Sequence, residues 1–320
     1  DDYHTITSIH VHDLVSSMLE HLPSSLHLVI VTRTDPPLSL ARMRAHDELL
    51  ELRAADLRFS RDETSAFLHQ SLPEALPESG IEKLEAVTEG WIVGLRIAAL
   101  MLKEQHPAER SRVLNTFSGS HRHVLEYLSA EVLSALPESQ GEFLLQVAFL
   151  HHLSGSLCDA VTLRDDSHEL LETLERANLF LMSLDDTATW YRLHPLVAEA
   201  LRQIAQKQMG TDAVRELHRR ASRWYEAHGH LQEAVEAALT AHAFAEASPL
   251  IECLIEPQLV KRNTEYHTLR RWIEHLPDEL LRRHPALCLT LGAAILFTSD
   301  RHAPTTAVQS ERVLRTAARP

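Results

Sequence analysis

Histidine is the residue whose spacing first suggests chemistry, because four pairs among its 22 copies stand close together. Imidazole is a common metal ligand, and a zinc site needs three or four ligands at a regular spacing. No cysteine or carboxylate recurs around these pairs at such a spacing, so we do not predict a metal site from them. The pairs are His10 and His12, His121 and His123, His151 and His152, and His228 and His230.

Glycine patterns limit the reactions that the chain can catalyse alone. None of the nine glycines is followed by lysine, so the loop G-x-x-x-x-G-K-[ST], whose amides and lysine cradle phosphates, is absent. A G-x-S-x-G nucleophile elbow is also missing, and Ser118-Gly119-Ser120 is typical of a loop. We therefore expect this chain by itself to bind no cofactor and to be no enzyme.

The charge balance argues against a nucleic-acid surface. The formal net charge is -14 and the pI is about 5.8, whereas phosphate neutralisation needs clustered Lys and Arg. The arginine pairs lie on amphipathic stretches beside Glu and Asp, which is typical of solvated helix faces. No apolar run approaches the roughly 18 residues that span a bilayer, and the start is not a signal peptide. We predict a cytoplasmic protein without a membrane partner.

The first 70 residues combine helical and strand patterns. Apolar residues recur at helical spacing over 10–21, and the β-branched run at 28–31 is typical of a strand buried on both faces of a parallel sheet. A weaker strand is predicted over 49–59, followed by a capping box that opens a helix at 60–68. Residues 1–70 are therefore predicted to be the C-terminal part of an α/β domain.

The rest of the chain is predicted to be mainly α-helical. Residues 71–120 form a helical extension, with helices at 81–87 and 91–102. Residues 121–208 are predicted to be a winged-helix domain, and residues 209–320 are predicted to form TPR-like helical repeats, the start of an α-solenoid. The winged-helix elements are helices at 121–135, 138–150, 156–163, 167–177 and 195–206, with strands at 179–184 and 189–193 joined by a turn at 185–187.

Four stretches, in this order, resemble the MalT-like large ATP-binding regulators of the LuxR type, which are signal-transduction ATPases with numerous domains. The resemblance covers essentially the whole chain and implies an internal fragment that lacks the P-loop and the C-terminal helix-turn-helix. It also implies that residues 1–70 are the C-terminal part of an α/β nucleotide-binding domain of P-loop type and that residues 71–120 are the helical extension of that domain. The stretches are Asp1 to His4, Leu28 to Pro37 with Leu50 to Phe59, Thr88 to Leu95, and Tyr191 to Leu196.

The resemblance also assigns roles to single residues. Asp1 and Asp2 would end the Walker B strand of the full-length parent, Asp1 near Mg²⁺ and Asp2 beside the attacking water, as the chemistry of a hard cation requires. Arg33 would be the sensor of a terminal phosphate. His194 would contact the β-phosphate of ADP and thereby lock the winged helix onto the nucleotide domain. Arg33 and His194 are thus expected to converge on one polyphosphate site.

Gly94 is a further candidate for nucleotide binding. In related ATPases a Gly-Leu-Pro stretch contacts the adenine, whereas in this sequence Arg96 follows Gly94-Leu95. The departure from the motif leaves a base contact from Gly94 open.

The implied function is an ATP-dependent transcriptional switch. In the parent, ADP would hold the parts closed, a small-molecule or protein inducer would bind the helical repeats, and ATP with Mg²⁺ would favour self-association. DNA would be bound only through a C-terminal domain outside this chain. The alternatives are a helical TPR-like scaffold with a vestigial nucleotide domain, and a parent whose output is a kinase or cyclase domain.

Overall fold

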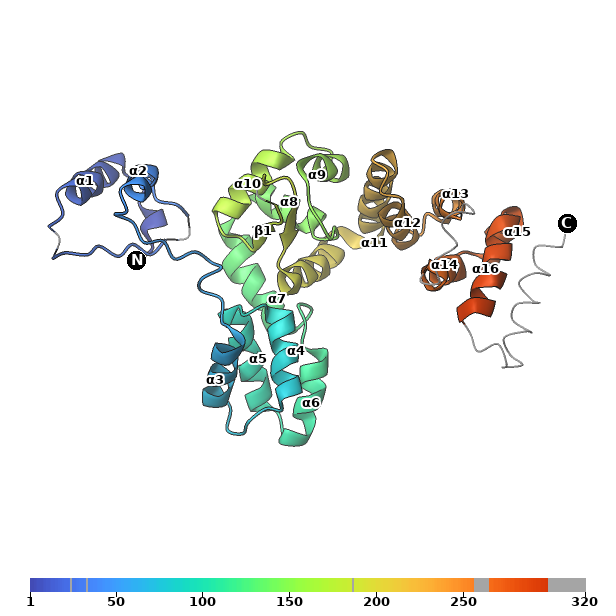
Figure 1. Cartoon of the computed structure of the whole chain (residues 1–320), viewed down its shortest axis with the longest axis horizontal. Helices are drawn as coiled ribbons and strands as arrows, with labels where there is room; N and C mark the ends of the chain where they lie inside the picture. Colours follow the sequence, from blue (N-terminus) through green and yellow to red (C-terminus); the bar gives the residue numbers. More distant parts are fainter. Residues whose placement is uncertain (24, 33, 186, 256–264, 299–320) are drawn as a thin grey trace. The chain divides into compact units, whose positions relative to one another are not determined.

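The computed structural model is built almost entirely of helices, which confirms the predicted mainly α class (Figure 1). Its contacts divide the chain into two compact units, residues 1–155 with 166–204 and residues 156–165 with 205–320. None of the described helices is long and apolar enough to cross a membrane. The residues that the structure describes are 1–23, 25–32, 34–185, 187–255 and 265–298.

The first sixty residues of the first unit have very little core. They form the short turn η1 (Tyr3–Thr5) and the helices α1 (Ile9–Glu20) and α2 (Leu40–Ala45). Helix α1 confirms the helix predicted over 10–21. Among the described residues up to 60, Tyr3 alone is buried. These helices are therefore not held by an apolar interior of their own.

Both strands predicted in this segment are wrong for the described residues. No strand is assigned over 28–31 or 49–59, and Val29 is 80% exposed. A strand requires a hydrogen-bonded neighbour, but among the described residues the backbone of 28–31 has one backbone partner, the N–H of Tyr3, which donates to the carbonyl oxygen of Val31 at 3.1 Å. The β-branched residues favour a buried strand, but no strand of the described residues lies beside them to form a sheet.

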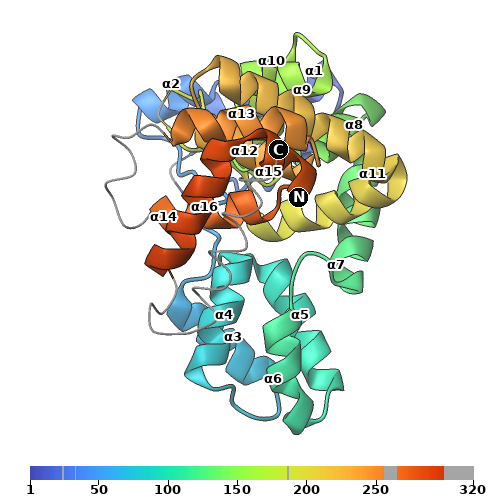
Figure 2. The ribbon, with the colours of Figure 1, turned by 90° about the vertical axis from the view of Figure 1, so that its right-hand side faces the viewer.

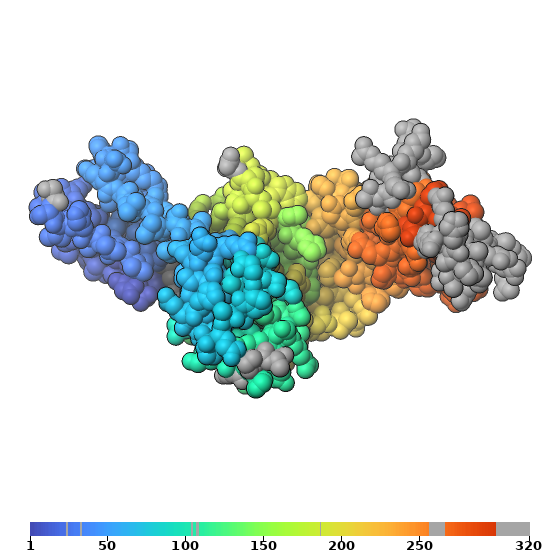
Figure 3. Space-filling model, turned by 60° about the horizontal axis from the view of Figure 1, so that its bottom comes forward, coloured from blue at the N-terminus to red at the C-terminus, as the bar shows by residue number. Residues whose placement is uncertain are grey.

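The segment from residue 61 to 116 is a packed bundle of four helices. The helices are α3 (Arg61–Ser71), α4 (Glu78–Thr88), α5 (Ile92–Glu104) and α6 (Pro107–Thr116). They lie against one another in both ribbon views, and Figure 3 shows one face of the bundle in space-filling form (Figures 1, 2 and 3). The Ser60 hydroxyl and the Glu63 carboxylate form the predicted capping box of α3. The core of the bundle includes Leu68, Leu84, Leu95 and Leu102, each at most 1% exposed.

The winged-helix elements follow the predicted order. The helix predicted at 121–135 consists of α7 (Arg122–Tyr127), a π-helical turn (Leu128–Val132) and a 3-10 turn (Leu133–Ala135). After it come α8 (Glu138–Val147), α9 (Gly155–Thr162) and α10 (Ser167–Arg176). Most of α9 clusters by contacts with the second unit.

A two-stranded hairpin confirms the predicted strand pair. Strands β1 (Leu181–Ser183) and β2 (Tyr191–Leu193) are antiparallel, and Met182 pairs with Arg192. The Asp185 carboxylate accepts a hydrogen bond from the Thr189 N–H at 2.8 Å, which supports the connecting turn. Asp186, in the predicted turn, lies outside the described residues.

Helix α11 (Pro195–Ala227) begins directly after this hairpin and is broken once. Gly210 has φ 80° and ψ 167°, values that interrupt the helix. Glycine adopts a positive φ without the steric strain of a Cβ atom, so it marks the break. The helix predicted over 195–206 is confirmed as the first part of α11.

Among its described residues, the second unit continues with five helices after α11. They are α12 (Leu231–Thr240), α13 (Phe244–Leu254), α14 (Glu265–Glu274), α15 (Asp278–Arg283) and α16 (Pro285–Thr298). Helix α12 packs on α13 and α14 packs on α16 around an apolar core that includes Val235, Ile251, Ile273 and Leu287. This core shows paired helices, whereas the assignment to TPR-like repeats remains a prediction.

Candidate functional site

His194 joins the winged-helix part of the first unit to the end of α4. It follows β2 directly, its own N–H donates to the carbonyl oxygen of Phe180 at 2.8 Å, and its side chain is 3% exposed. The imidazole Nε2 lies 2.8 Å from the carbonyl oxygen of Thr88. Since that oxygen can only accept, Nε2 carries a proton in this contact.

The other ring nitrogen of His194 has no such partner. Nδ1 is buried and makes no hydrogen bond among the residues that the structure describes. Burial lowers the pKa of His194, an effect that the Thr88 carbonyl and the Glu89 charge oppose and that Arg58 and Arg192 reinforce. The neutral ring with a bare Nδ1 is therefore the favoured form, which leaves one buried polar atom available to a ligand.

The ring of Trp91 packs against the imidazole and is itself in contact with two further aromatic rings. The Trp91 ring centroid lies 5.8 Å from that of His194 in an edge-to-face arrangement, 5.0 Å from Phe180 and 5.8 Å from Tyr127. Such pairs restrict ring orientation more than aliphatic contacts do. Trp91 thus holds the His194 ring against the turn that ends α4.

Gly94 lies close to the start of α11. A Cβ built at Gly94 would meet Trp91 at 3.0 Å, Thr88 at 3.2 Å and Leu196 at 3.2 Å. The missing side chain lets α5 approach Leu196, two residues after His194. The structure therefore brings two of the predicted nucleotide-binding residues together, and it gives Gly94 a packing role there. Its contact with an adenine remains a prediction.

The end of α4 meets β2 and His194, and we call this contact the junction. Glu89 is the charged centre of the junction. It ends α4 with φ 45° in the left-handed region, and it accepts hydrogen bonds from Arg192 at 2.8 and 3.1 Å and from Arg58 at 3.3 Å. Burial disfavours its charge, but the hydrogen bonds and charge of Arg192, helped by His194 and Arg58, leave the pKa of Glu89 below its usual value. The carboxylate is therefore ionised at neutral pH.

The backbone next to Glu89 is also tightly packed. Gly90 has φ +73°, its carbonyl oxygen accepts from the Phe59 N–H at 2.9 Å, and a Cβ here would lie 2.3 Å from the Phe59 carbonyl oxygen. Only glycine fits at such a distance. The turn from Thr88 to Trp91 is consequently in contact with the segment before α3 and with the winged helix.

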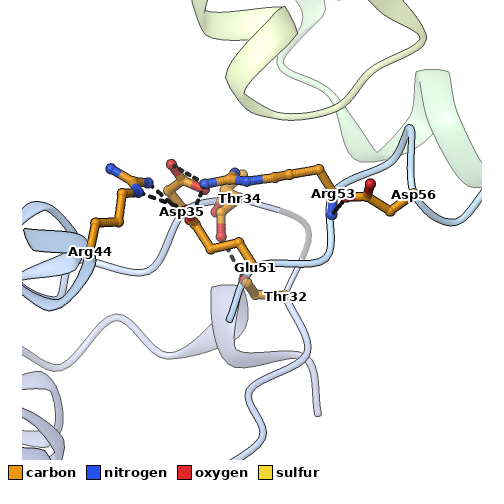
Figure 4. A network of polar contacts seen from close by, with 7 residues as sticks. All are labelled: Thr32, Thr34, Asp35, Arg44, Glu51, Arg53 and Asp56. Carbon is orange, nitrogen blue, oxygen red and sulfur yellow. Dashed lines mark hydrogen bonds and ion pairs between the residues drawn. The ribbon is translucent and has the colours of Figure 1, made fainter. Parts of the chain in front are cut away.

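Arg33, the predicted phosphate sensor, lies outside the described residues, so its convergence with His194 remains a prediction. Thr32, Thr34 and Asp35, its neighbours in the sequence, belong to the polar network of Figure 4. Arg53 donates to Asp35 at 2.5 Å and to Glu51 at 2.5 Å, and Arg44 donates to Glu51 at 2.7 and 2.9 Å. The Thr32 hydroxyl donates to the Thr34 carbonyl oxygen at 2.8 Å. The network thus ties Asp35 to the segment at 51–53 and Thr32 to Thr34.

Asp1 and Asp2, the predicted Walker B carboxylates, are exposed. The Asp2 N–H donates to Asp1 Oδ1 at 3.1 Å, and Asp2 has φ 52°. Across the part of the chain that the structure describes, no three His, Cys, Asp or Glu side chains are grouped to hold a metal ion. The structure thus brings no further ligand to Asp1, and the Mg²⁺ assignment remains a prediction.

The sequence reasoning missed the three charged residues of the junction. Arg58, Glu89 and Arg192 each lie inside a stretch on which the resemblance rested, but they are separated by 31 and 103 residues. Ion pairs across such separations cannot be read from local periodicity. The signal present in the sequence was that each of the three stands next to an apolar residue or a glycine.

Comparisons with known proteins agree with this architecture. The sequence profile of the MalT winged helix domain matches residues 129–213. The chain is 32% identical over 290 residues to the HTH-type transcriptional regulator MalT of Yersinia pestis (strain Pestoides F) and, equally, to that of Yersinia enterocolitica. In each case the alignment covers 90% of this chain and 32% of the relative, so the chain spans about a third of the length of these curated relatives.

The matched residues 129–213 contain the hairpin, His194 and the first part of α11, which are the elements that build one side of the junction. The wider similarity extends over nine-tenths of the chain. The chain is therefore MalT-like, with a MalT winged helix domain at its centre.

Proposed function

We propose that this chain is the switch portion of an ATP-responsive transcriptional regulator and that His194 reports the nucleotide state. The observation that carries the proposal is the His194 ring, buried between the end of α4 and the winged helix with Nδ1 free of hydrogen bonds. The similarity to relatives named HTH-type transcriptional regulator supports the regulatory output.

The chemistry of the ring limits how it can meet a phosphate oxygen. Because Nε2–H is used by the Thr88 carbonyl, a hydrogen bond from Nδ1 to a phosphate requires a second ring proton and hence an imidazolium ion. A nearby phosphate favours that charged form and opposes the burial that lowers the pKa of His194. Nucleotide binding at His194 is therefore coupled to proton uptake.

The other nucleotide contacts belong to the same proposal. Arg33 would read the terminal phosphate, Gly94 would lie near the base, and Asp1 and Asp2 would hold Mg²⁺ and a water in a longer protein that supplies the phosphate-binding loop. The described residues place Gly94 beside Leu196 and the ring of Trp91 beside His194. A contact between nucleotide and winged helix would let the ligand bias their association, because only differential affinity shifts such an equilibrium.

The remaining functions fall outside this junction. The helices α12 to α16 would form TPR-like repeats that bind a small-molecule or protein inducer, and the ATP state would self-associate in the cytoplasm. DNA would be read by a segment outside this chain. The formal charge of -14 supports this division, since phosphate contacts need clustered cations.

Replacing His194 in the full-length gene product tests the proposal. With His194→Ala, we expect ADP affinity to fall by about tenfold, the loss of one charge-assisted hydrogen bond, and basal transcription to rise. His218→Ala, in the second part of α11, is the control. Unchanged ADP affinity and unchanged basal activity in His194→Ala would remove the locking role and favour a helical scaffold.

A further inference from the structure

Two arginines at the junction share one carboxylate. Glu89 accepts from Arg192 in a forked arrangement at 2.8 and 3.1 Å and from Arg58 at 3.3 Å. The three side chains are 33%, 23% and 32% exposed for Arg58, Glu89 and Arg192, so they are partly removed from water. One negative charge here faces two fixed positive charges.

This local excess of positive charge is a feature of an anion site. Planar guanidinium groups bind carboxylate and phosphate oxygens in the same forked geometry, so the position of the Glu89 carboxylate is one that a phosphate could occupy. The charges of Arg58, Arg192 and Glu89 all act on His194. The unoccupied Nδ1 of His194 is a second, independent sign that this region is prepared for a ligand.

The backbone allows Glu89 to be placed there. The left-handed φ of 45° at Glu89 and of 73° at Gly90 turn the chain sharply after α4. A non-glycine residue in the left-handed region is strained, so the ion pairs with Arg192 and Arg58 help to maintain the conformation. The same contacts hold the end of α4 to β2.

We propose that Glu89 is an internal competitor that occupies an oxyanion site between Arg58 and Arg192, and that a phosphate-type ligand displaces it. The inference rests on the proposed function of His194 as a phosphate contact and adds the regulation of that site. Displacement would leave the arginines paired to the ligand while Glu89 turns to water. The carboxylate thus sets the ligand concentration at which the junction responds.

Displacement would also change what the arginines hold in place. Arg58 lies in the segment that enters α3, and its guanidinium contacts the sulfur of Met182 on β1 at 2.6 Å. Arg192 lies opposite Met182 in the hairpin. A ligand that moved Glu89 would therefore change the contacts of the hairpin as well as those of the end of α4.

Pyrophosphate binding to this chain tests the inference by calorimetry at fixed ionic strength. Glu89→Gln keeps the shape of the side chain and removes the competing charge, so we expect it to bind pyrophosphate at least about tenfold more tightly than the unmodified chain, because no charged hydrogen bond must first be broken. Adding Arg192→Gln to that variant should abolish the gain. Glu85→Gln, one turn earlier on α4, is the matched control and should leave the affinity unchanged.

Glu89→Asp provides a second test should the neutral variant not fold, because it keeps the charge but shortens the reach to both arginines. It should also bind pyrophosphate more tightly than the unmodified chain. Folded variants at position 89 with unaltered affinity, or a gain that survives loss of Arg192, would overturn the inference. If Glu89→Gln gains affinity while His194→Ala leaves ADP binding unchanged, the anion site stands and the nucleotide role of His194 fails. If Glu89→Gln leaves pyrophosphate affinity unchanged while His194→Ala weakens ADP binding, the role of Glu89 as a competitor fails and the nucleotide role of His194 stands.

Discussion

The first sixty residues and the segment from 61 to 204 differ in how far their apolar side chains are buried. Both contain runs of apolar residues, but Val29 is 80% exposed whereas Leu95, on α5, is fully buried. The later segment supplies its own packing partners within a few helices, whereas the earlier one has little buried surface and exposed ion pairs such as Arg44 with Glu51. Burial, rather than apolar composition, therefore distinguishes the packed segment from the exposed one.

The largest expected effect is on the core of the winged helix. Phe143 on α8 is 1% exposed, so Phe143→Ala should lower the free energy of unfolding by about 3–5 kcal/mol through lost burial and the cavity that remains. Leu50 is 87% exposed, and Leu50→Ala should change it by less than about 0.5 kcal/mol. Urea unfolding followed by circular dichroism measures both. Equal effects would erase the contrast between the two regions.

A second pair of substitutions compares a glycine with no room for a side chain, Gly90, with one that has open space, Gly141. Gly90→Ala places a Cβ 2.3 Å from the Phe59 carbonyl oxygen at a positive φ, and it should destabilise the chain by about 1–3 kcal/mol. Gly141, inside α8, has nothing within 4 Å of such a Cβ, so Gly141→Ala should stabilise by about 0.5–1 kcal/mol. If the turn after α4 is as tight as described, the melting temperature should fall in Gly90→Ala and rise in Gly141→Ala.

Most of the winged helix could be predicted from the sequence, because its signals are local. Asp185 and Thr189 mark the turn of the hairpin, and the paired strands at 181–183 and 191–193 fell within the predicted ranges. The strand at 28–31 was wrong, since its β-branched residues report a preference that only neighbouring strands can satisfy. His194 and Gly94 could be named from the sequence and lie on elements that pack together, while their contact with a nucleotide stays a prediction. Glu89 was missed because its partners lie far away in sequence.

The buried imidazole of His194 should make the unfolding free energy depend on pH, an effect of intermediate size. The pKa of His194 is lowered in the folded chain, so the unfolded chain binds the proton more readily once the pH falls below about 6.5. Stability from the neutral ring is complete above that pH and declines as the pH falls toward the folded value. His194→Gln should make the unfolding free energy less dependent on pH between 7 and 5. Identical slopes in the two proteins would contradict burial of a neutral ring.

The smallest effect is expected in the exposed network near Arg33. Hydrogen bonds from Arg44, against some desolvation and with help from Arg53, lower the pKa of Glu51 to about 2. Its contribution to stability is therefore present above the ordinary carboxyl range and is lost as the pH falls toward 2. Arg44→Gln should raise the pKa of Glu51 in an NMR titration with little change in unfolding by urea, because exposed ion pairs contribute weakly. An unshifted carboxyl would show that the pair does not form.

The ionisation of His194 with and without nucleotide is the most direct test of the account. In the full-length gene product at neutral pH, ¹⁵N spectra of the imidazole should show a single proton, on Nε2, when the site is empty. Saturation with ADP should add a proton at Nδ1 and produce the imidazolium signal, and uptake of that proton should be measurable by calorimetry in buffers of different ionisation enthalpy. A ring whose two nitrogen signals stay unchanged on addition of ADP would contradict the proposed role of His194.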